Sequence, residues 1–222
     1  MYWYILITGL IVVRILDKRF KKRIKTDKGV IGEADVHQEI REYPGYKKTL
    51  GNCYLPTDNG TTEIDLILIN ECGIFVIESK NYGGDICGDE NNLMWNEFIP
   101  VKGNGPQRYD FYNPLMQNET HIKWLKHCLS DEGDVPIYSL VLFSNRSNLR
   151  NINRTSGKHH IANQDSLKYI LNDISNDTKE YLSKERINSL YKKLRPYTHV
   201  SKAQRKAHIE NIRMKYGENK GA

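Results

Sequence analysis

The sequence predicts an α/β fold, and two observations support this prediction. First, two apolar runs at residues 64–69 and 74–77 flank the short break Asn70-Glu71-Cys72-Gly73. Asn and Gly tolerate the backbone angles of a tight reversal, so this stretch predicts a β-hairpin whose strands are buried on both faces. Second, apolar residues recur at helical spacing in segments before and after the hairpin. Strands and amphipathic helices therefore share one chain.

The composition is globular, but the charge is unevenly distributed. The 222 residues are enough for one good-sized domain with appendages. Residues 1–27 carry seven Lys and Arg against two Asp, a net charge of +5, and residues 184–222 carry eleven against three Glu, a net charge of +8. Residues 28–183 carry fifteen basic and twenty-two acidic residues, a net charge of −7. Such an acidic body repels nucleic acid unless a metal ion or local Lys and Arg residues offset it.

The cysteines indicate a reducing compartment. The four of them are scattered along the chain and form no CxxC pair: Cys53, Cys72, Cys87 and Cys128. This spacing argues against a structural zinc site and gives no support to a disulfide framework. We expect mostly buried free thiols.

The N-terminus predicts a membrane anchor helix. Residues 1–16 carry no charge before Arg14, they begin with an aromatic group at residues 2–4, and a basic cluster follows at residues 18–25. A helix of this length spans roughly 24 Å at about 1.5 Å per residue, which is short of the roughly 30 Å hydrocarbon core. Because the positive charge follows the apolar run, a cleaved secretory signal is disfavoured and the rest of the chain is expected in the cytoplasm. An ordinary buried helix is the alternative.

Residues 28–42 predict a helix that stops at Tyr43-Pro44-Gly45. Glu33 lies in its first turn. A carboxylate at that position commonly interacts with the helix dipole, and it could instead project towards a functional site.

Further strands and helices follow in alternation. The loop prediction covers residues 101–110, which contain Gly and Pro. A helix is expected from Asn113 as N-cap and Pro114 at the first helical position, with Gln117 and His121 on one face. The other strands are expected at residues 49–55, 85–87, 93–98 (with Trp95 in the core), 135–143 and 158–162. The other helices are expected at residues 164–173 and 178–194, and the tail from Thr198 is expected to be a basic helix or a flexible extension.

Charged residues at the strand ends of the hairpin predict a catalytic site. Asp65 lies inside the first apolar run, and Glu78 and Lys80 close the second. The ends of adjacent strands meet, so Asp65 and Glu78 can lie side by side, and Glu78 and Lys80 point to one face. Two carboxylates make an oxygen-rich site that suits Mg²⁺ or Mn²⁺, and a nearby lysine can stabilise the charge of a phosphoryl group in reaction. The same spacing also arises by chance on strand ends.

Several motifs in the same order resemble the nuclease-related domain (NERD) family, over about residues 29–129. They are Gly32-Glu33, Glu63-Ile64-Asp65, residues 73–82, Gly84, Trp95, and Asn113-Pro114 followed by Gln117. The resemblance implies a restriction-endonuclease-like fold of the PD-(D/E)xK superfamily, with a mixed β-sheet flanked by helices. It also implies that Asp65 and Glu78 are the metal-binding acids, that Lys80 is the catalytic lysine, and that Glu33 and Gln117 are polar residues of the site.

The resulting hypothesis is a membrane-anchored, cytoplasmic, Mg²⁺- or Mn²⁺-dependent nuclease that acts on DNA. The expected organisation is an anchor helix at residues 1–16, a basic linker at 17–27, a nuclease-like core at 28–145, a helical C-terminal part at 146–197 and a basic tail at 198–222. Two alternatives remain: an inactive module of the same fold that binds nucleic acid or protein at the membrane, and a scaffold whose basic ends contact anionic lipid. His121 is expected to be an ordinary surface or core histidine.

Overall fold

The structure, a computed structural model, describes residues 36–216. The chain divides into two compact units, Met1–Glu42 and Tyr43–Ala222, and the labelled elements all belong to the second. In the first unit residues 36–42 are helical, which confirms that part of the predicted helix. The predicted anchor helix, the basic linker and Glu33 lie outside the described residues. Within the described residues, no helix is long and apolar enough to cross a membrane.

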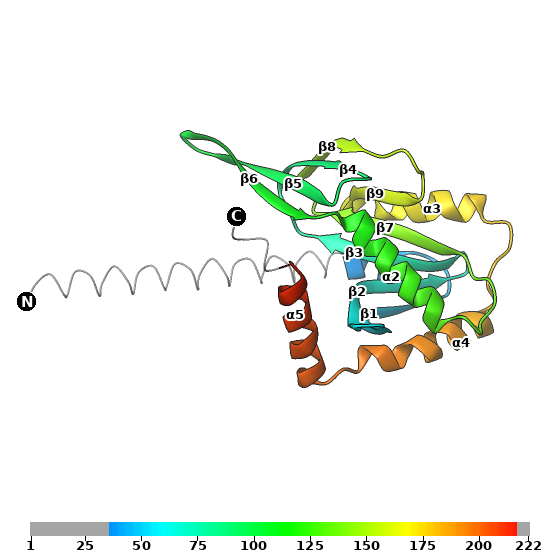
Figure 1. Cartoon of the computed structure of the whole chain (residues 1–222). Coiled ribbons are helices and arrows are strands. Elements are labelled where there is room, and N and C mark those ends of the chain that lie inside the picture. Colours follow the sequence, from blue (N-terminus) through cyan, green and yellow to red (C-terminus); the bar gives the residue numbers. More distant parts are fainter. Residues whose placement is uncertain (1–35, 217–222) are drawn as a thin grey trace, which may run out of the picture. The chain divides into compact units, whose positions relative to one another are not determined.

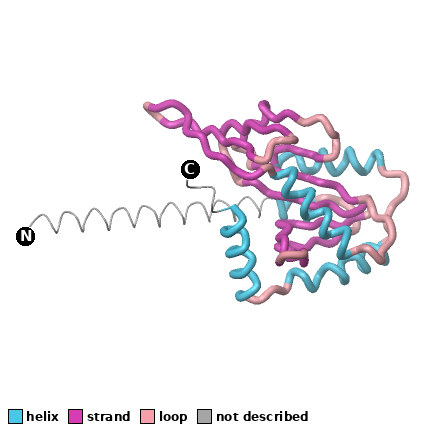
Figure 2. Tube along the Cα trace, in the orientation of Figure 1, coloured by secondary structure: helices cyan, strands magenta, loops and turns pink. Residues whose placement is uncertain are grey.

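The strands of the second unit form two mixed sheets, as the predicted α/β class requires (Figures 1 and 2). The first has the order β1-β2-β3-β7-β9, with parallel pairing of β3 to β7 and of β7 to β9. The second has the order β6-β5-β4-β8, with parallel pairing of β4 to β8. The bounds of the first sheet are β1 Lys47–Thr57, β2 Gly60–Asn70, β3 Gly73–Lys80, β7 Ile137–Phe143 and β9 His159–Asn163. Those of the second are β4 Gly84–Asp89, β5 Met94–Val101, β6 Asn104–Tyr112 and β8 Ser147–Asn153.

Helices pack against the first sheet. Helices α2 and α4 share one apolar cluster with β1, β2 and β3, and their core residues include Leu125 and Leu190. Helix α3 packs against β9, and α5 packs against β2. Their bounds are α2 Pro114–Cys128, α3 Leu167–Asp177, α4 Lys184–Leu194 and α5 Lys202–Tyr216, with short 3₁₀ turns at Gln164–Ser166 and Arg195–Thr198.

The predicted hairpin is confirmed as strands β2 and β3. They are antiparallel, and Asn70 pairs with Gly73 at the turn. Gly73 has φ +141°, and a Cβ added there would lie 2.4 Å from the carbonyl oxygen of Pro136, so both conformation and space favour glycine. The Asn70 side chain accepts a hydrogen bond from the backbone of Cys72 at 2.9 Å. The apolar residues of β3 are fully buried, as expected for a strand covered on both faces.

The predicted loop at residues 101–110 is wrong, because residues 104–110 belong to strand β6. These seven residues are all exposed, and β6 pairs only with β5 at the edge of the second sheet. Backbone pairing rather than burial forms this strand, so its sequence has no apolar alternation to reveal it. Strand β8, Ser147–Asn153, also lacks an apolar alternation: five of its seven residues are polar, and Leu149 and Ile152 are only partly buried.

In the C-terminal part, the start of one predicted helix is wrong, and the basic tail is shown to be a helix. The helix predicted from residue 178 begins at Lys184, where Ser183 accepts a hydrogen bond from the backbone of Arg186 as N-cap. The basic tail is a helix, α5, at Lys202–Tyr216. Trp95 is fully buried in the core, as predicted, and stacks on Phe143.

The start of α2 is fixed by Asn113, which is fully buried. Its side-chain oxygen accepts a hydrogen bond from the backbone of Leu115 at 2.9 Å, which confirms the predicted N-cap. Its side-chain nitrogen donates to the carbonyl oxygens of Glu90 at 3.0 Å and Asn92 at 2.7 Å. One side chain thus ties the helix to the β4–β5 turn.

Replacing Asn113 tests this double role. We expect Asn113→Ala to lower the free energy of unfolding by about 2–4 kcal/mol, since it removes a cap worth about 1 kcal/mol and leaves buried carbonyls unsatisfied at about 1–3 kcal/mol. Asn113→Asp keeps the cap acceptor but loses the donors. Urea unfolding measures both, with the exposed Asn176→Ala as control. Equal stabilities of the Asn113 and Asn176 variants would contradict this role.

Candidate active site

Asp65 and Glu78 are brought together by the register of β2 and β3. Leu66 pairs with Ile77, so the acids that precede and follow this pair are neighbours across the two strands. The Asp65 carboxylate accepts a hydrogen bond from the backbone nitrogen of Ser79 at 3.0 Å. The two acids therefore meet at the end of β3, where the sequence predicted them.

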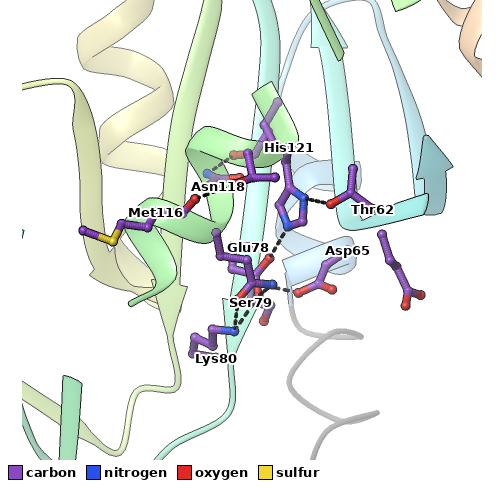
Figure 3. Close-up of polar contacts among 12 residues, drawn as sticks. Thr62, Asp65, Glu78, Ser79, Lys80, Met116, Asn118 and His121 are labelled. Carbon is purple, nitrogen blue, oxygen red and sulfur yellow. Dashed lines mark hydrogen bonds and ion pairs between the residues drawn. The ribbon is translucent and has the colours of Figure 1, made fainter. Parts of the chain in front are cut away.

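Glu78 is the centre of a polar cluster, and its exposed fraction is only 2%. Lys80 Nζ lies 2.6 Å from Glu78 Oε1, and Gln117 Nε2 donates to the same oxygen at 2.8 Å. Lys80 also donates to Gln117 Oε1 at 2.9 Å. His121 Nε2 lies 3.3 Å from Glu78 Oε2 (Figure 3). The predicted neighbourhood of Glu78, Lys80 and Gln117 is thus present in the geometry.

Electrostatics keep Glu78 and Lys80 charged. Burial by itself would raise the pKa of Glu78, but the Lys80 ammonium and the contact with His121 more than offset it, so the pKa is lowered. Burial by itself would lower the pKa of Lys80, but the Glu78 carboxylate more than offsets it, so the pKa is raised. Each charge therefore stabilises the other in a site shielded from water.

His121 is a residue of the site that the sequence reasoning set aside. It is buried, and its ring lies between Glu78 and Thr62, with Nδ1 at 2.7 Å from Thr62 Oγ1. A carboxylate only accepts hydrogen bonds, so Nε2 donates to Glu78, and in the neutral ring Nδ1 then accepts from the Thr62 hydroxyl. The signal in the sequence was its position one helical turn after Gln117.

Asn118 fixes the position of α2 over the sheet. It is fully buried, and its side-chain nitrogen donates to the carbonyl oxygen of Val76 on β3 at 3.0 Å and to Ser139 Oγ on β7 at 2.8 Å. Because Gln117 is the preceding residue of the same helix, these bonds hold Gln117 over the end of β3.

The site lies where the chain passes from one sheet to the other. After Lys80 the chain leaves β3 and enters β4, and after Phe143, which pairs with Lys80, it leaves β7 and enters β8. The two crossings are joined by a hydrogen bond from Ser144 N to the Lys80 carbonyl at 2.9 Å and by one from Arg146 to Asn81 at 2.7 Å. The backbone on both sides of Lys80 is therefore held in place.

The donor set fits a hard cation. Among the described residues no group of three or more His, Cys, Asp or Glu side chains is arranged to hold a metal ion. Mg²⁺, however, is commonly held by one or two carboxylates together with waters and substrate phosphates. Glu78 already receives three internal contacts, and a carboxylate has about four acceptor positions. Asp65 and Glu78 together provide the two carboxylates that a Mg²⁺ ion would need.

Comparisons with known proteins show what this chain is similar to. A family model described as "Nuclease-related domain" matches residues 28–144. The chain is also similar to an uncharacterized protein of Bacillus anthracis, at 29% identity over 219 residues that cover 96% of this chain and 99% of that protein. No solved structure matches the chain.

Breaking the buried pair should destabilise the fold. In Lys80→Met the Glu78 carboxylate stays buried without its cation, and we expect a loss of about 3–5 kcal/mol in the free energy of unfolding at neutral pH. Burial then raises the pKa of Glu78 above its value in the unfolded chain. The deficit therefore shrinks as the pH falls, because a protonated Glu78 needs no counter-charge.

Two further variants make the measurement specific. Glu78→Gln combined with Lys80→Met should lose less stability than Lys80→Met alone, since no buried charge remains unpaired. Arg108→Met breaks an exposed pair with Asp110, also two residues apart on a strand, and should cost less than about 1 kcal/mol. Urea unfolding across the pH range measures these losses. Equal losses of unfolding free energy in Lys80→Met and Arg108→Met would refute the pairing.

Proposed function

The chain belongs to the nuclease-related domain (NERD) family of the PD-(D/E)xK-like superfamily, and we propose that it is a metal-dependent nuclease that hydrolyses phosphodiester bonds of DNA. The observation that carries this proposal is the contact of Glu78 with Lys80, next to the Asp65 carboxylate. An acid pair and a lysine at one strand end are the groups that phosphodiester hydrolysis needs.

Asp65 and Glu78 are the residues that would hold the metal, and Mg²⁺ or Mn²⁺ suits their oxygens. When bound, such an ion supplies Lewis-acid polarisation of the phosphoryl group and a more acidic water. Glu33 is proposed as a further acid of the site from the family pattern alone.

Lys80 has the clearest role of the chain's own residues. Its ammonium group has three donors, and Glu78 and Gln117 accept two of them. The third remains for a phosphoryl oxygen, on which negative charge increases as water attacks phosphorus and the ester P–O bond breaks. Gln117 orients Lys80 and Glu78 together, since it donates to one and accepts from the other. His121 is a positioning residue, which holds Glu78 from the other side.

Cleavage assays test this assignment. With Mg²⁺ or Mn²⁺ the full chain should cleave linear, nicked or single-stranded DNA, and EDTA should abolish the cleavage. Asp65→Asn should remove the activity, and Lys80→Met should lower the rate by about 100- to 1,000-fold, the usual loss when one charge-stabilising donor is removed. Asp177→Asn and Lys179→Met, at exposed positions, are the matched controls.

The outcomes separate the competing hypotheses. Cleavage that persists in Asp65→Asn and Lys80→Met would refute the site. A folded chain that cleaves no substrate in either metal would favour the inactive module that binds nucleic acid or protein.

We also propose that residues 1–16 anchor the protein in the membrane with the nuclease unit in the cytoplasm. The support is the sequence: an apolar segment with aromatic residues at its start and a basic cluster after it. Fractionation of cells expressing the full chain should find it with membranes, resistant to high salt and released by detergent. A variant that begins at residue 17 should be released. Recovery of the full chain in the soluble fraction would exclude the anchor.

A further inference from the structure

A cleft of about 930 Å³ opens beside the candidate site in the described part of the chain. Asp65, Gln117 and His121 line it, whereas Glu78 and Lys80 do not. A substrate phosphate can therefore reach Asp65 through this cleft. Its other walls come from the turn between β1 and β2, from α2 and from α5.

The size of the cleft suits one strand of nucleic acid. A cube of this volume would have edges of roughly 10 Å, which is less than the ~12 Å width of the major groove alone in B-DNA. The volume falls within the range of small-molecule sites, about 300–1,000 Å³. A single nucleotide of an unpaired strand is small enough to enter such a space, whereas the full width of a double helix is not.

The charge of the cleft determines which part of a nucleotide it accepts. Its lining includes the carboxylates of Asp58, Glu63 and Asp65, and no Lys or Arg of the described residues contributes to it. Phosphate groups are repelled from such a surface, whereas a neutral base is not. The base is therefore expected inside the cleft, with its phosphate at the side of the cleft where Asp65 lies.

Trp124 provides an aromatic surface for that base. It lines the cleft, is half-buried, and packs on the core cluster from one side. The exposed Lys123 places its ammonium over the ring, 5.0 Å from the ring centre, so a base that stacks on this face displaces that long and flexible side chain. Bases stack on such rings whatever their identity, and the displaced cation can contact a neighbouring phosphate.

Helix α5 forms another wall of the cleft and is held to β1 and β2 by specific contacts. Its His208 is buried, lies 3.0 Å from Thr61 Oγ1, and packs edge-on against Tyr54 at 5.3 Å. One turn later Asn211 lines the cleft. Gly60, with φ +133°, leaves room for it, since a Cβ there would lie 2.8 Å from the Asn211 amide nitrogen. The turn is thus shaped to receive α5.

We propose that this cleft binds one unpaired base of single-stranded DNA, next to the phosphate that is cleaved. Trp124 stacks on the base, and Asn211 offers a side-chain amide to its polar edge. This inference deepens the proposed nuclease function and rests on it for the fate of the phosphate. The binding of the base can be measured without cleavage.

Fluorescence anisotropy in EDTA provides that measurement. The full chain should bind a fluorescein-labelled single strand of 12 nucleotides at least about tenfold more tightly than the blunt duplex of the same sequence, because only the unpaired strand can stack on Trp124. Trp124→Leu should weaken single-strand binding by about 5- to 100-fold, and Trp124→Phe should largely restore it. Asn211→Ala, which changes an exposed residue, should weaken it with unchanged unfolding midpoint.

The controls are Tyr169→Leu and Ile209→Ala. Tyr169 is an exposed aromatic residue on α3, and Ile209 is an exposed residue on α5 that does not line the cleft. Neither should change the affinity. Equal affinity of the wild-type chain for single strand and duplex, or equal effects of the cleft and control variants, would overturn the inference.

A parallel cleavage assay separates this inference from the proposed function. Preferential single-strand binding that depends on Trp124, without cleavage in any metal, would support the base site and refute the nuclease. Metal-dependent cleavage of blunt duplex and single strand at equal rates, unaffected by Trp124→Leu, would support the nuclease and refute the base site.

Discussion

The candidate site depends on one constraint: the Glu78 carboxylate is buried and must be compensated. An unpaired charge in such a place is prohibitively unfavourable. Lys80 supplies the counter-charge from the same strand, Gln117 and His121 supply polar contacts from α2, and Thr62 supports His121 from β2. Three separate elements must therefore be in register before the carboxylate can be tolerated. The groups that satisfy Glu78 are also those that a phosphodiester hydrolase needs, so stability and proposed function share one set of contacts.

That constraint explains the buried asparagines of α2. Gln117 and His121 reach Glu78 only if the helix has one rotation and one height above the sheet. Asn113 fixes the start of the helix on the β4–β5 turn, and Asn118 fixes it to β3 and β7. Apolar packing alone is non-directional and would tolerate small shifts, whereas these hydrogen bonds are lost when donor and acceptor separate. The buried Asn113 and Asn118 side chains therefore set the position of α2 on the sheet.

Sequence reasoning recovered what apolar patterns and turn chemistry encode. The hairpin of β2 and β3, the N-cap Asn113 and the shared face of Glu78 and Lys80 follow from local spacing. Strands β6 and β8 could not be recovered. Residues 104–110 of β6 are exposed and show no apolar alternation, although its partner β5 directly precedes it in the chain. Strand β8 is mostly polar, and its partner β4 is distant in the chain. His121 was undervalued for a related reason: its contacts to Thr62 and Glu78 span 59 and 43 residues. Nothing within a local window distinguishes it from an ordinary core histidine.

The charge distribution, which argued against nucleic-acid binding at first, is consistent with it once α5 is placed. The acidic cleft repels phosphates, but α5 forms one of its walls and carries Lys202, Arg205 and Lys206 at exposed positions. Exposed charges act over about one screening length, roughly 8 Å at physiological salt, so these residues attract a strand where its backbone passes close to α5. In the proposed complex, positive charge outside the cleft attracts the backbone and the acidic lining favours a neutral base. On this proposal attraction and selection are separated in space, so the proposed metal-binding acids and a polyanionic substrate can coexist.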